Sequence, residues 1–351
     1  MGALSGHMLH PYENIQLSIS DLEDILKKSF SNQMEFVEKV DGYNLHVLIT
    51  PQKEIRVARS GKDLLNGGIP VEEIFDRFSH NIPFANAIYQ AIPKIRKYFE
   101  SNPASIITFS EYNPVTFNLE ILRKGVTNII PYDHFQIVMH GMVCWNKQEE
   151  DKGYTIERMI PMGNVPKIII SIDEFTRKVI LEDILNRLED VFGFHETIQD
   201  LYFDRMVDFL QNFNLQIPDN IDYFFRYFFD KDQRIPASFI KSQCNSEESI
   251  LLYNLLIHST LKNPEFIRQL KQYTIQPLKD LIRYIGNILL HNCHGYLNEN
   301  MSGMEFLSKY PQLPEHNYYQ HKLEGLVFDY KGVTYKWTGD FMVINKLRIG
   351  I

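Results

Sequence analysis

Cysteine is scarce in this chain, with only Cys144, Cys244 and Cys293 among its 351 residues. A sparse, odd set without C-x-x-C spacing excludes a disulfide framework and a zinc ribbon, and it indicates a reducing compartment. No apolar run approaches the roughly 18 residues that a membrane-spanning helix needs. The Met1–Met8 segment has neither the basic nor the long apolar region of a signal peptide. We therefore expect a cytoplasmic protein.

An excess of basic charge is also missing. The 36 lysines and arginines are outnumbered by 44 aspartates and glutamates, for a net charge of −8. Proteins that bind duplex nucleic acid are usually basic, because they must neutralise phosphates, so any contact with nucleic acid here has to be local. What the chain does have is 44% apolar and 13% aromatic residues. That is enough for a large buried core in more than one domain.

Hydrophobic patterning changes along the chain. Leu45, Val47 and Ile49 alternate with polar residues, which predicts a half-buried strand, and Lys331-Gly332 between two apolar runs predicts a hairpin. We expect an α+β fold in which a helical domain is inserted into a β-rich core. The expected divisions are an N-terminal segment (1–33), the first part of the core (34–170), the helical insertion (171–310) and the C-terminal strands of the core (311–351).

The middle of the chain predicts amphipathic helices. Ser171 and Glu174 have capping-box spacing, and apolar residues recur at helical intervals over 181–192 and 278–289. Residues 171–310 hold 14 basic and 20 acidic side chains, a net charge of −6. Because acidic groups repel a polyanion, we expect this region to be a lid, or a docking surface for a protein or small acceptor, rather than a track for nucleic acid.

A series of short motifs carries the functional prediction. The first is Glu38-Lys39-Val40-Asp41-Gly42, a K-x-D-G pattern, although a surface lysine before an Asp-Gly turn explains that motif better when it is taken alone. The motifs that follow in chain order are Arg59 with Ser60-Gly61, Phe109-Ser110-Glu111, Phe135, Glu324-Gly325-Leu326-Val327, and Lys336.

In this order the series resembles the covalent nucleotidyltransferase superfamily of ATP-dependent DNA ligases, RNA ligases and mRNA-capping enzymes. The resemblance covers about 34–140 and 321–346 and leaves the middle of the chain unmatched. It implies an antiparallel-sheet nucleotidyltransferase core, an ATP-grasp-like ligase fold. It also implies ATP and Mg²⁺ as cofactors, a lysyl-AMP intermediate, and a single-stranded or nicked polynucleotide as acceptor, RNA rather than DNA.

The resemblance implies a role for each residue of the series. Lys39 carries the nucleotide and Lys336 grips the α-phosphate. The residues implied to bind the nucleotide are Asp41, Gly42, Arg59, Glu111 and Phe135. The residues implied to hold the metal are Glu324 and Glu111.

Elementary chemistry agrees with a lysine at this position. An amine attacks phosphorus only when it is neutral, and a free lysine has a pKa of about 10.4, so a site that uses one must lower that pKa by desolvation or by nearby positive charge. Lys39 stands between Val37 and Val40, which would partly desolvate it, and Lys336 would supply the second positive charge.

Some features of this chain differ from those of many members of the superfamily. Phe328 follows the E-G-x-V motif where many ligases carry a lysine, and Lys336 is not followed by the usual second lysine. The sequence stops at Ile351, so we expect no C-terminal OB domain, which favours an RNA-ligase-like arrangement. The 335–341 segment and the His-x-x-His pattern at 7–10 are also similar to uncharacterised ligase-like proteins of large tailed phages.

Two other classes of function stay open. One is adenylyl transfer to a protein or small molecule, and the other is a catalytically decayed, ligase-like module that binds a protein. His291-Asn292-Cys293-His294 suits zinc only if a further ligand joins it, and packing at a helix end explains it better. The aromatic run 223–229 is more typical of a helix core than of a base-stacking platform. Gly67-Gly68 lacks the remaining residues of a phosphate-binding P-loop.

Overall fold

The protein is described from a computed structural model, which covers residues 8–40, 42–50, 54–101, 115–122, 135–147, 154–161, 167–170, 172–230, 235–294 and 324–339. The chain forms two compact units. One spans residues 38–166, and the other joins residues 8–37 to residues 167–351. Helices and antiparallel sheets occur together, which confirms the α+β class. The expected division into a core and an inserted helical domain stays a prediction.

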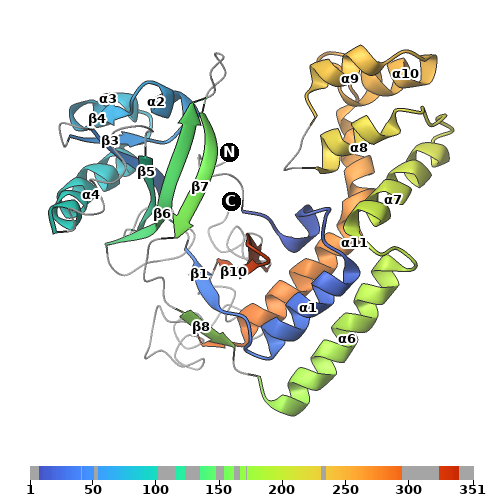
Figure 1. The fold of residues 1–351 in the computed structure, drawn as a ribbon, viewed down its shortest axis with the longest axis horizontal. Helices are drawn as coiled ribbons and strands as arrows, with labels where there is room; N and C mark the ends of the chain where they lie inside the picture. Colours follow the sequence, from blue (N-terminus) through green and yellow to red (C-terminus); the bar gives the residue numbers. More distant parts are fainter. Residues whose placement is uncertain are drawn as a thin grey trace. The chain divides into compact units, whose positions relative to one another are not determined.

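The first unit is built on a six-stranded sheet with the strand order β4-β3-β2-β5-β6-β7 (Figure 1). Its strands are β2 (Tyr43–Ile49), β3 (Ile55–Ala58), β4 (Ile69–Pro70), β5 (Val115–Leu122), β6 (Gln136–Lys147) and β7 (Tyr154–Pro161). Its helices are α2 (Gly61–Leu65), η2 (Val71–Glu73), α3 (Ile74–Arg77) and α4 (Ile82–Ser101). Every neighbouring pair of these strands is antiparallel.

One face of this sheet is apolar and packs against α4 (Figure 1). Leu45 and Val47 of β2 point to this face, as the alternation in the sequence predicts, and both are fully buried. Ile88 and Ala91 of α4 are fully buried in the same core. The other face of the sheet carries the polar side chains of β2 and β5 and is described with the site below.

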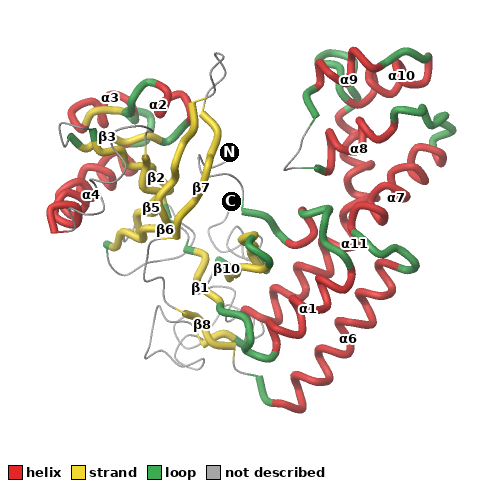
Figure 2. Tube along the Cα trace, viewed as in Figure 1, coloured by secondary structure: helices red, strands yellow, loops and turns green. Residues whose placement is uncertain are grey.

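The second unit combines a small sheet with a set of packed helices (Figure 2). Its strands are β1 (Phe36–Lys39), β8 (Lys167–Ile170), β9 (Cys293–His294), β10 (Gly325–Tyr330) and β11 (Val333–Trp337), in the order β11-β10-β1-β8-β9. Its helices are η1 (Pro11–Glu13), α1 (Ile19–Phe30), α6 (Glu174–Phe192), α7 (Ile198–Asn212), α8 (Ile221–Phe229), α9 (Ala237–Gln243), α10 (Glu247–Leu256) and α11 (Pro264–His291). The long α11 packs against α6 and α7, and α1 packs against α6. The boundary between the units falls within β1, after Val37.

Most local predictions for the second unit are confirmed. The apolar repeats at 181–192 and 278–289 lie in α6 and α11, and Lys331 and Gly332 form the two-residue turn between β10 and β11. Both turn residues have positive φ, at 49° and 79°, as a type I′ hairpin requires. The aromatic run 223–229 lies in α8, where Phe224, Phe225 and Phe229 are buried, so its core interpretation is confirmed.

The capping box predicted from Ser171 is wrong. Helix α6 begins at Glu174, and its N-cap is Asp173, whose carboxylate accepts a hydrogen bond from the Thr176 N–H at 2.9 Å. An aspartate caps a helix as well as a serine does, so the helix starts directly after Asp173, which accepts the hydrogen bond from its first turn. Ser171 itself is outside the described residues. None of the helices in the described part combines the length and the apolar character that crossing a bilayer demands.

An ionic contact ties α1 to the β10–β11 hairpin in the second unit. The Asp21 carboxylate accepts hydrogen bonds from Lys331 Nζ at 2.6 Å and from the Tyr330 hydroxyl at 3.1 Å. It also bonds Ser18 in the capping box of α1. Burial by itself would raise the pKa of Asp21, but the hydrogen bonds from Lys331, Ser18 and Tyr330 outweigh it and lower the pKa to about 2.

We expect Asp21→Asn to cost about 1 kcal/mol of unfolding free energy at pH 7, a modest value because the Lys331 side chain is exposed. The pKa is lowered on folding, so the contribution of Asp21 is complete above its ordinary value of 3.8 and is lost as the pH falls toward 2. Urea unfolding of the unchanged protein and of the Asp21→Asn variant between pH 7 and pH 3 measures this difference in unfolding free energy. Asp190→Asn, on an exposed position of α6, is the control, and an equal loss in both variants at all pH values would contradict the assignment.

Candidate functional site

Four strand ends meet at one end of the sheet of the first unit. Because neighbouring strands are antiparallel, β2 and β6 begin at this end, whereas β3 and β5 finish there. The registers that place them are His46↔Ala58, Tyr43↔Ile121 and Leu122↔Gln136. Neighbouring strands of a sheet are about 4.8 Å apart. The fold thus gathers Gly42, Arg59, Glu120 and Phe135 at one end of the sheet.

Gly42 makes the closest contact of this group. Its main-chain N–H donates a hydrogen bond to Glu120 Oε1 at 2.5 Å. A Cβ atom on residue 42 would lie 2.6 Å from Glu120 Cγ, 2.6 Å from Leu122 Cδ2 and 2.9 Å from the carbonyl oxygen of Ile121. No side chain fits there without displacing β5, which is a physical reason for the glycine of the K-x-D-G motif. The loop that follows Lys39 is thereby held against β5.

Glu120 is a residue that our sequence analysis missed. Glu111, chosen there as the strand glutamate of the series, lies outside the described residues, and its role stays a prediction. A signal for Glu120 was present, because β5 alternates between apolar and polar positions from Val115 to Ile121. The apolar positions are Phe117, Leu119 and Ile121, and the polar ones are Thr116, Asn118 and Glu120. Such alternation places all three polar side chains on one face of the sheet.

That polar face continues from Glu120 into a buried row of neutral side chains. Asn44 Nδ2 donates to Asn118 Oδ1 at 2.8 Å, and His46 Nδ1 lies 3.1 Å from Thr116 Oγ1. His46 is 1% exposed, and burial lowers its pKa to about 4, so the ring is neutral at pH 7. These two hydrogen bonds join β2 to β5 on this face, and the neutral row brings no positive charge to the Glu120 carboxylate.

Arg59 follows β3 and has an exposed side chain. Its guanidinium carbon lies 4.3 Å from the ring centroid of buried Phe84, a cation–π contact that orients the group. Its main-chain N–H donates to Asp63 Oδ2 at 3.2 Å, and Arg77 Nη2 donates to the same carboxylate at 2.8 Å. The pKa of Asp63 is lowered, since the hydrogen bonds from Arg77 and Ser60 outweigh the opposing effect of its burial. The main chain of Arg59 is therefore anchored while the guanidinium faces solvent.

Phe135 precedes β6 and is half-buried against the apolar core of the first unit. The Nζ atom of Lys94, on α4, lies 4.4 Å from its ring centroid. Packing against the core thus explains why an aromatic residue stands at this position even without a ligand. A role for Phe135 in binding the nucleotide stays a prediction.

Lys39 is the last residue of β1 and is half-buried. It precedes Gly42 by three residues, so their Cα atoms are at most about 11 Å apart. Lys39 therefore lies close to the end of the sheet at which Arg59 and Glu120 are found. Asp41, which stands between Lys39 and Gly42 in the motif, is outside the described residues.

Glu324 and Lys336 belong to the second unit. Glu324 directly precedes β10 and is half-buried, and Lys336 lies on β11, paired with Val327 of β10. The main-chain N–H of Lys336 donates to the carbonyl oxygen of Leu9 at 2.9 Å, and the residue is only 9% exposed. The sequence series also predicts that these two residues share one cleft with Lys39, Arg59 and Glu111. That prediction joins residues of both units and stays a prediction.

The possible zinc motif at 291–294 ends α11. Within the part of the chain that the structure describes, no group of three or more histidine, cysteine, aspartate or glutamate side chains is arranged to hold a metal ion. Cys293 is fully buried and its Sγ donates to the carbonyl oxygen of Leu289 at 3.1 Å. Burial raises the pKa of this thiol, whereas a zinc ligand must be a thiolate. Cys293 therefore behaves as a packed core residue.

Comparison with known proteins adds no relative to this picture. No family model, no curated protein and no solved structure matches the chain. A functional assignment must therefore come from the residues themselves, and chiefly from the sheet end where Gly42 meets Glu120.

Proposed function

We propose that the protein is an ATP-dependent covalent nucleotidyltransferase that forms a lysyl-AMP intermediate on Lys39. The observation that carries the proposal is the hydrogen bond from the Gly42 N–H to Glu120, at the sheet end where Arg59 and Phe135 also lie. Each of these side chains has a separate structural explanation. These residues come from strands far apart in the sequence and share one end of the sheet beside a K-x-D-G lysine, with Glu120 on the polar face and with Phe135 and the Arg59 guanidinium on the side of the apolar core. Their common place at this end favours a common chemical purpose.

In the proposed reaction the neutral amine of Lys39 attacks the α-phosphorus of ATP. An N–P bond forms, the bond from the α-phosphorus to the oxygen bridging to the β-phosphate breaks, and pyrophosphate leaves. The amine nitrogen loses its proton to solvent. Phosphoryl transfer of this kind depends on positioning and electrostatic stabilisation. Anchoring the loop after Lys39 on β5 supplies part of that positioning.

Other side chains have roles that fit their surroundings. The exposed guanidinium of Arg59 is suited to bind ribose or phosphate oxygens, and Lys336 is proposed to contact the α-phosphate. Mg²⁺ bound with a nucleoside triphosphate needs one or two carboxylates from the protein, because phosphate oxygens and water complete its coordination. Glu324 is suited to this role, as is Glu111 by the resemblance. The bound ion would neutralise charge that develops on the phosphates.

The proposed acceptor is a polynucleotide, RNA rather than DNA. With a net charge of −8, the chain would contact such an acceptor locally, through the few cations near the reacting phosphate. Adenylyl transfer to a protein or a small molecule is the alternative acceptor class. A catalytically decayed binding module is the alternative without chemistry.

Intact-mass spectrometry of the full chain tests the proposal. Incubation with Mg²⁺ and each of the four nucleoside triphosphates separately should add one nucleotide, about 329 Da for AMP. Absence of any adduct would exclude the enzyme and leave the binding module.

A second incubation identifies the acceptor class. The purified adduct should lose its AMP to a 5′-phosphorylated single-stranded RNA faster than to a DNA of the same sequence. An adduct that is stable to both oligonucleotides would instead point to a protein or small-molecule acceptor.

A further inference from the structure

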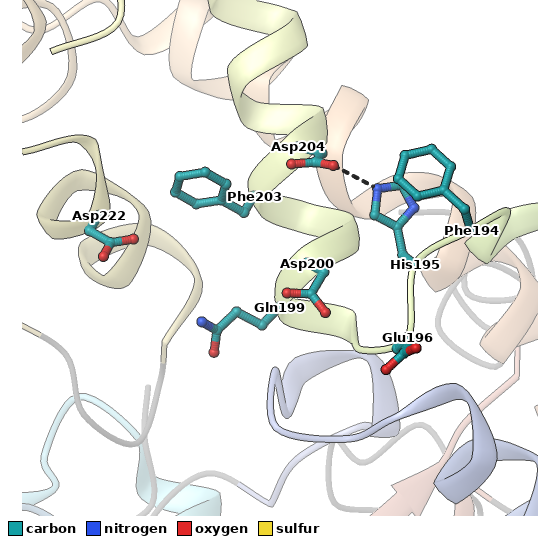
Figure 3. A pocket seen from close by; sticks show the side chains of 8 residues that line it. All are labelled: Phe194, His195, Glu196, Gln199, Asp200, Phe203, Asp204 and Asp222. Atoms are coloured by element: carbon teal, nitrogen blue, oxygen red, sulfur yellow. Dashed lines mark hydrogen bonds and ion pairs between the residues drawn. The ribbon is translucent and has the colours of Figure 1, made fainter. Parts of the chain in front are cut away.

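The second unit contains an open pocket formed by the α6–α7 connection, the first half of α7 and the first turn of α8 (Figure 3). Its volume is about 490 Å³, within the range of about 300–1,000 Å³ that is typical of ligand pockets. The lining residues are Phe194, His195, Glu196, Gln199, Asp200, Phe203, Asp204 and Asp222. Neither the motif series nor the proposed reaction uses any of them.

Aromatic rings make up the apolar part of this pocket. Phe194 is 84% exposed, which is unusual for so large an apolar side chain. Helix α6 ends at Gly193, which has a φ of 58° and immediately precedes Phe194. The Phe194 ring stacks on the His195 ring, with the two ring centroids 4.2 Å apart. Phe203 projects from α7 into the space between α7 and Asp222 of α8 (Figure 3). The pocket thus presents two aromatic rings to a ligand.

Carboxylates surround these rings. Asp204 is engaged by His195, whose Nε2 lies 3.0 Å from Oδ2, and Asp200 accepts a hydrogen bond from the Thr197 hydroxyl at 2.7 Å. The carboxylates of Glu196 and Asp222 differ from these two. Among the residues that the structure describes, neither lies within ion-pair distance of a cationic side chain. Negative charge next to open aromatic faces is therefore available in this pocket.

We propose that this pocket binds a basic segment of a protein partner, with an arginine or lysine side chain placed between the rings and the carboxylates. Two interactions would stabilise a bound cation here, because it is attracted both to the face of an aromatic ring and to a carboxylate. The net charge of −6 over residues 171–310 steers a basic segment toward this unit and repels phosphates. The inference is independent of nucleotidyl transfer at Lys39.

Fluorescence anisotropy tests the proposal with the full chain and a labelled decapeptide of alternating arginine and glycine. We expect binding at low salt that weakens as salt rises. The double variant Glu196→Gln/Asp222→Asn should raise the Kd about tenfold, and Phe194→Ala should raise it severalfold. All six positions changed in these variants and in their controls are exposed, so thermal melting should be unchanged and will verify folding.

Matched controls separate the pocket from general acidity. Glu182→Gln/Asp190→Asn removes the same charge from exposed positions of α6, and Phe175→Ala removes a ring that is 78% exposed. Both controls should change the Kd less than about twofold. The proposal is overturned if the peptide does not bind, if the controls weaken binding as much as the pocket variants do, or if the pocket variants weaken binding of single-stranded RNA instead.

Discussion

Lys39→Ala is expected to abolish formation of the nucleotide adduct. The Ala side chain has no amine to attack the α-phosphorus, and Lys336, the other lysine assigned to the site, is proposed to hold the α-phosphate as a cation and not to attack it. Intact-mass spectrometry after incubation with ATP and Mg²⁺ should show only the unmodified chain. Since Lys39 is a half-buried residue at the end of β1, the fold should survive the loss of its side chain.

Two further variants sharpen this test. Lys39→Arg should fail as completely as alanine, because a guanidinium stays protonated and cannot attack. Lys97→Ala, an exposed lysine on α4, should form the adduct at the rate of the unchanged protein. Adduct formation by Lys39→Ala would show that the nucleophile is another residue.

Glu120→Ala is expected to lower the rate of adduct formation about 100-fold. The variant removes the acceptor of the Gly42 N–H, so the loop that carries the K-x-D-G motif loses its attachment to β5. Displacement of a reacting group by as little as 1 Å can cost a factor of about 10² in rate. Single-turnover incubation with ATP, sampled by mass spectrometry, measures the rate.

Glu120→Gln separates the hydrogen bond from the charge. Its amide oxygen can still accept from Gly42, so a positioning role predicts a rate much closer to that of the unchanged protein than to that of Glu120→Ala. If glutamine is as damaging as alanine, the negative charge itself is required, as it would be for a metal ligand. Unchanged rates in both variants would remove Glu120 from the site.

Where the relevant interactions are local, the sequence predicted the structure well. The alternation around Val47 and the apolar spacing of α6 and α11 depend only on the repeat of the backbone, which is fixed by the strand or helix itself. The Lys331-Gly332 turn was predictable because two adjacent residues with positive φ suffice to make it. The start of α6 was misplaced by a few residues because several polar side chains near a helix start can cap it.

The contact between Gly42 and Glu120 could not be obtained in the same way. The two residues are 78 positions apart, and they meet only because β2 pairs with β5 in one register. The alternation in β5 shows that Glu120 shares a face with Asn118, but a shift of the pairing would carry Glu120 away from Asn44, its partner in β2, and so away from Gly42. Register is set by the packing of the whole sheet against α4, which no local pattern contains.

The pocket at Phe194 shows the same division. By itself the sequence determined that the middle of the chain is helical and acidic, since composition and periodicity are properties of the chain alone. Only the tertiary structure decided that Asp222 of α8 faces Phe203 of α7 and that Phe194 stays outside the core. These arrangements follow from the packing of helices against one another, where side chains distant in sequence compete for the same buried volume.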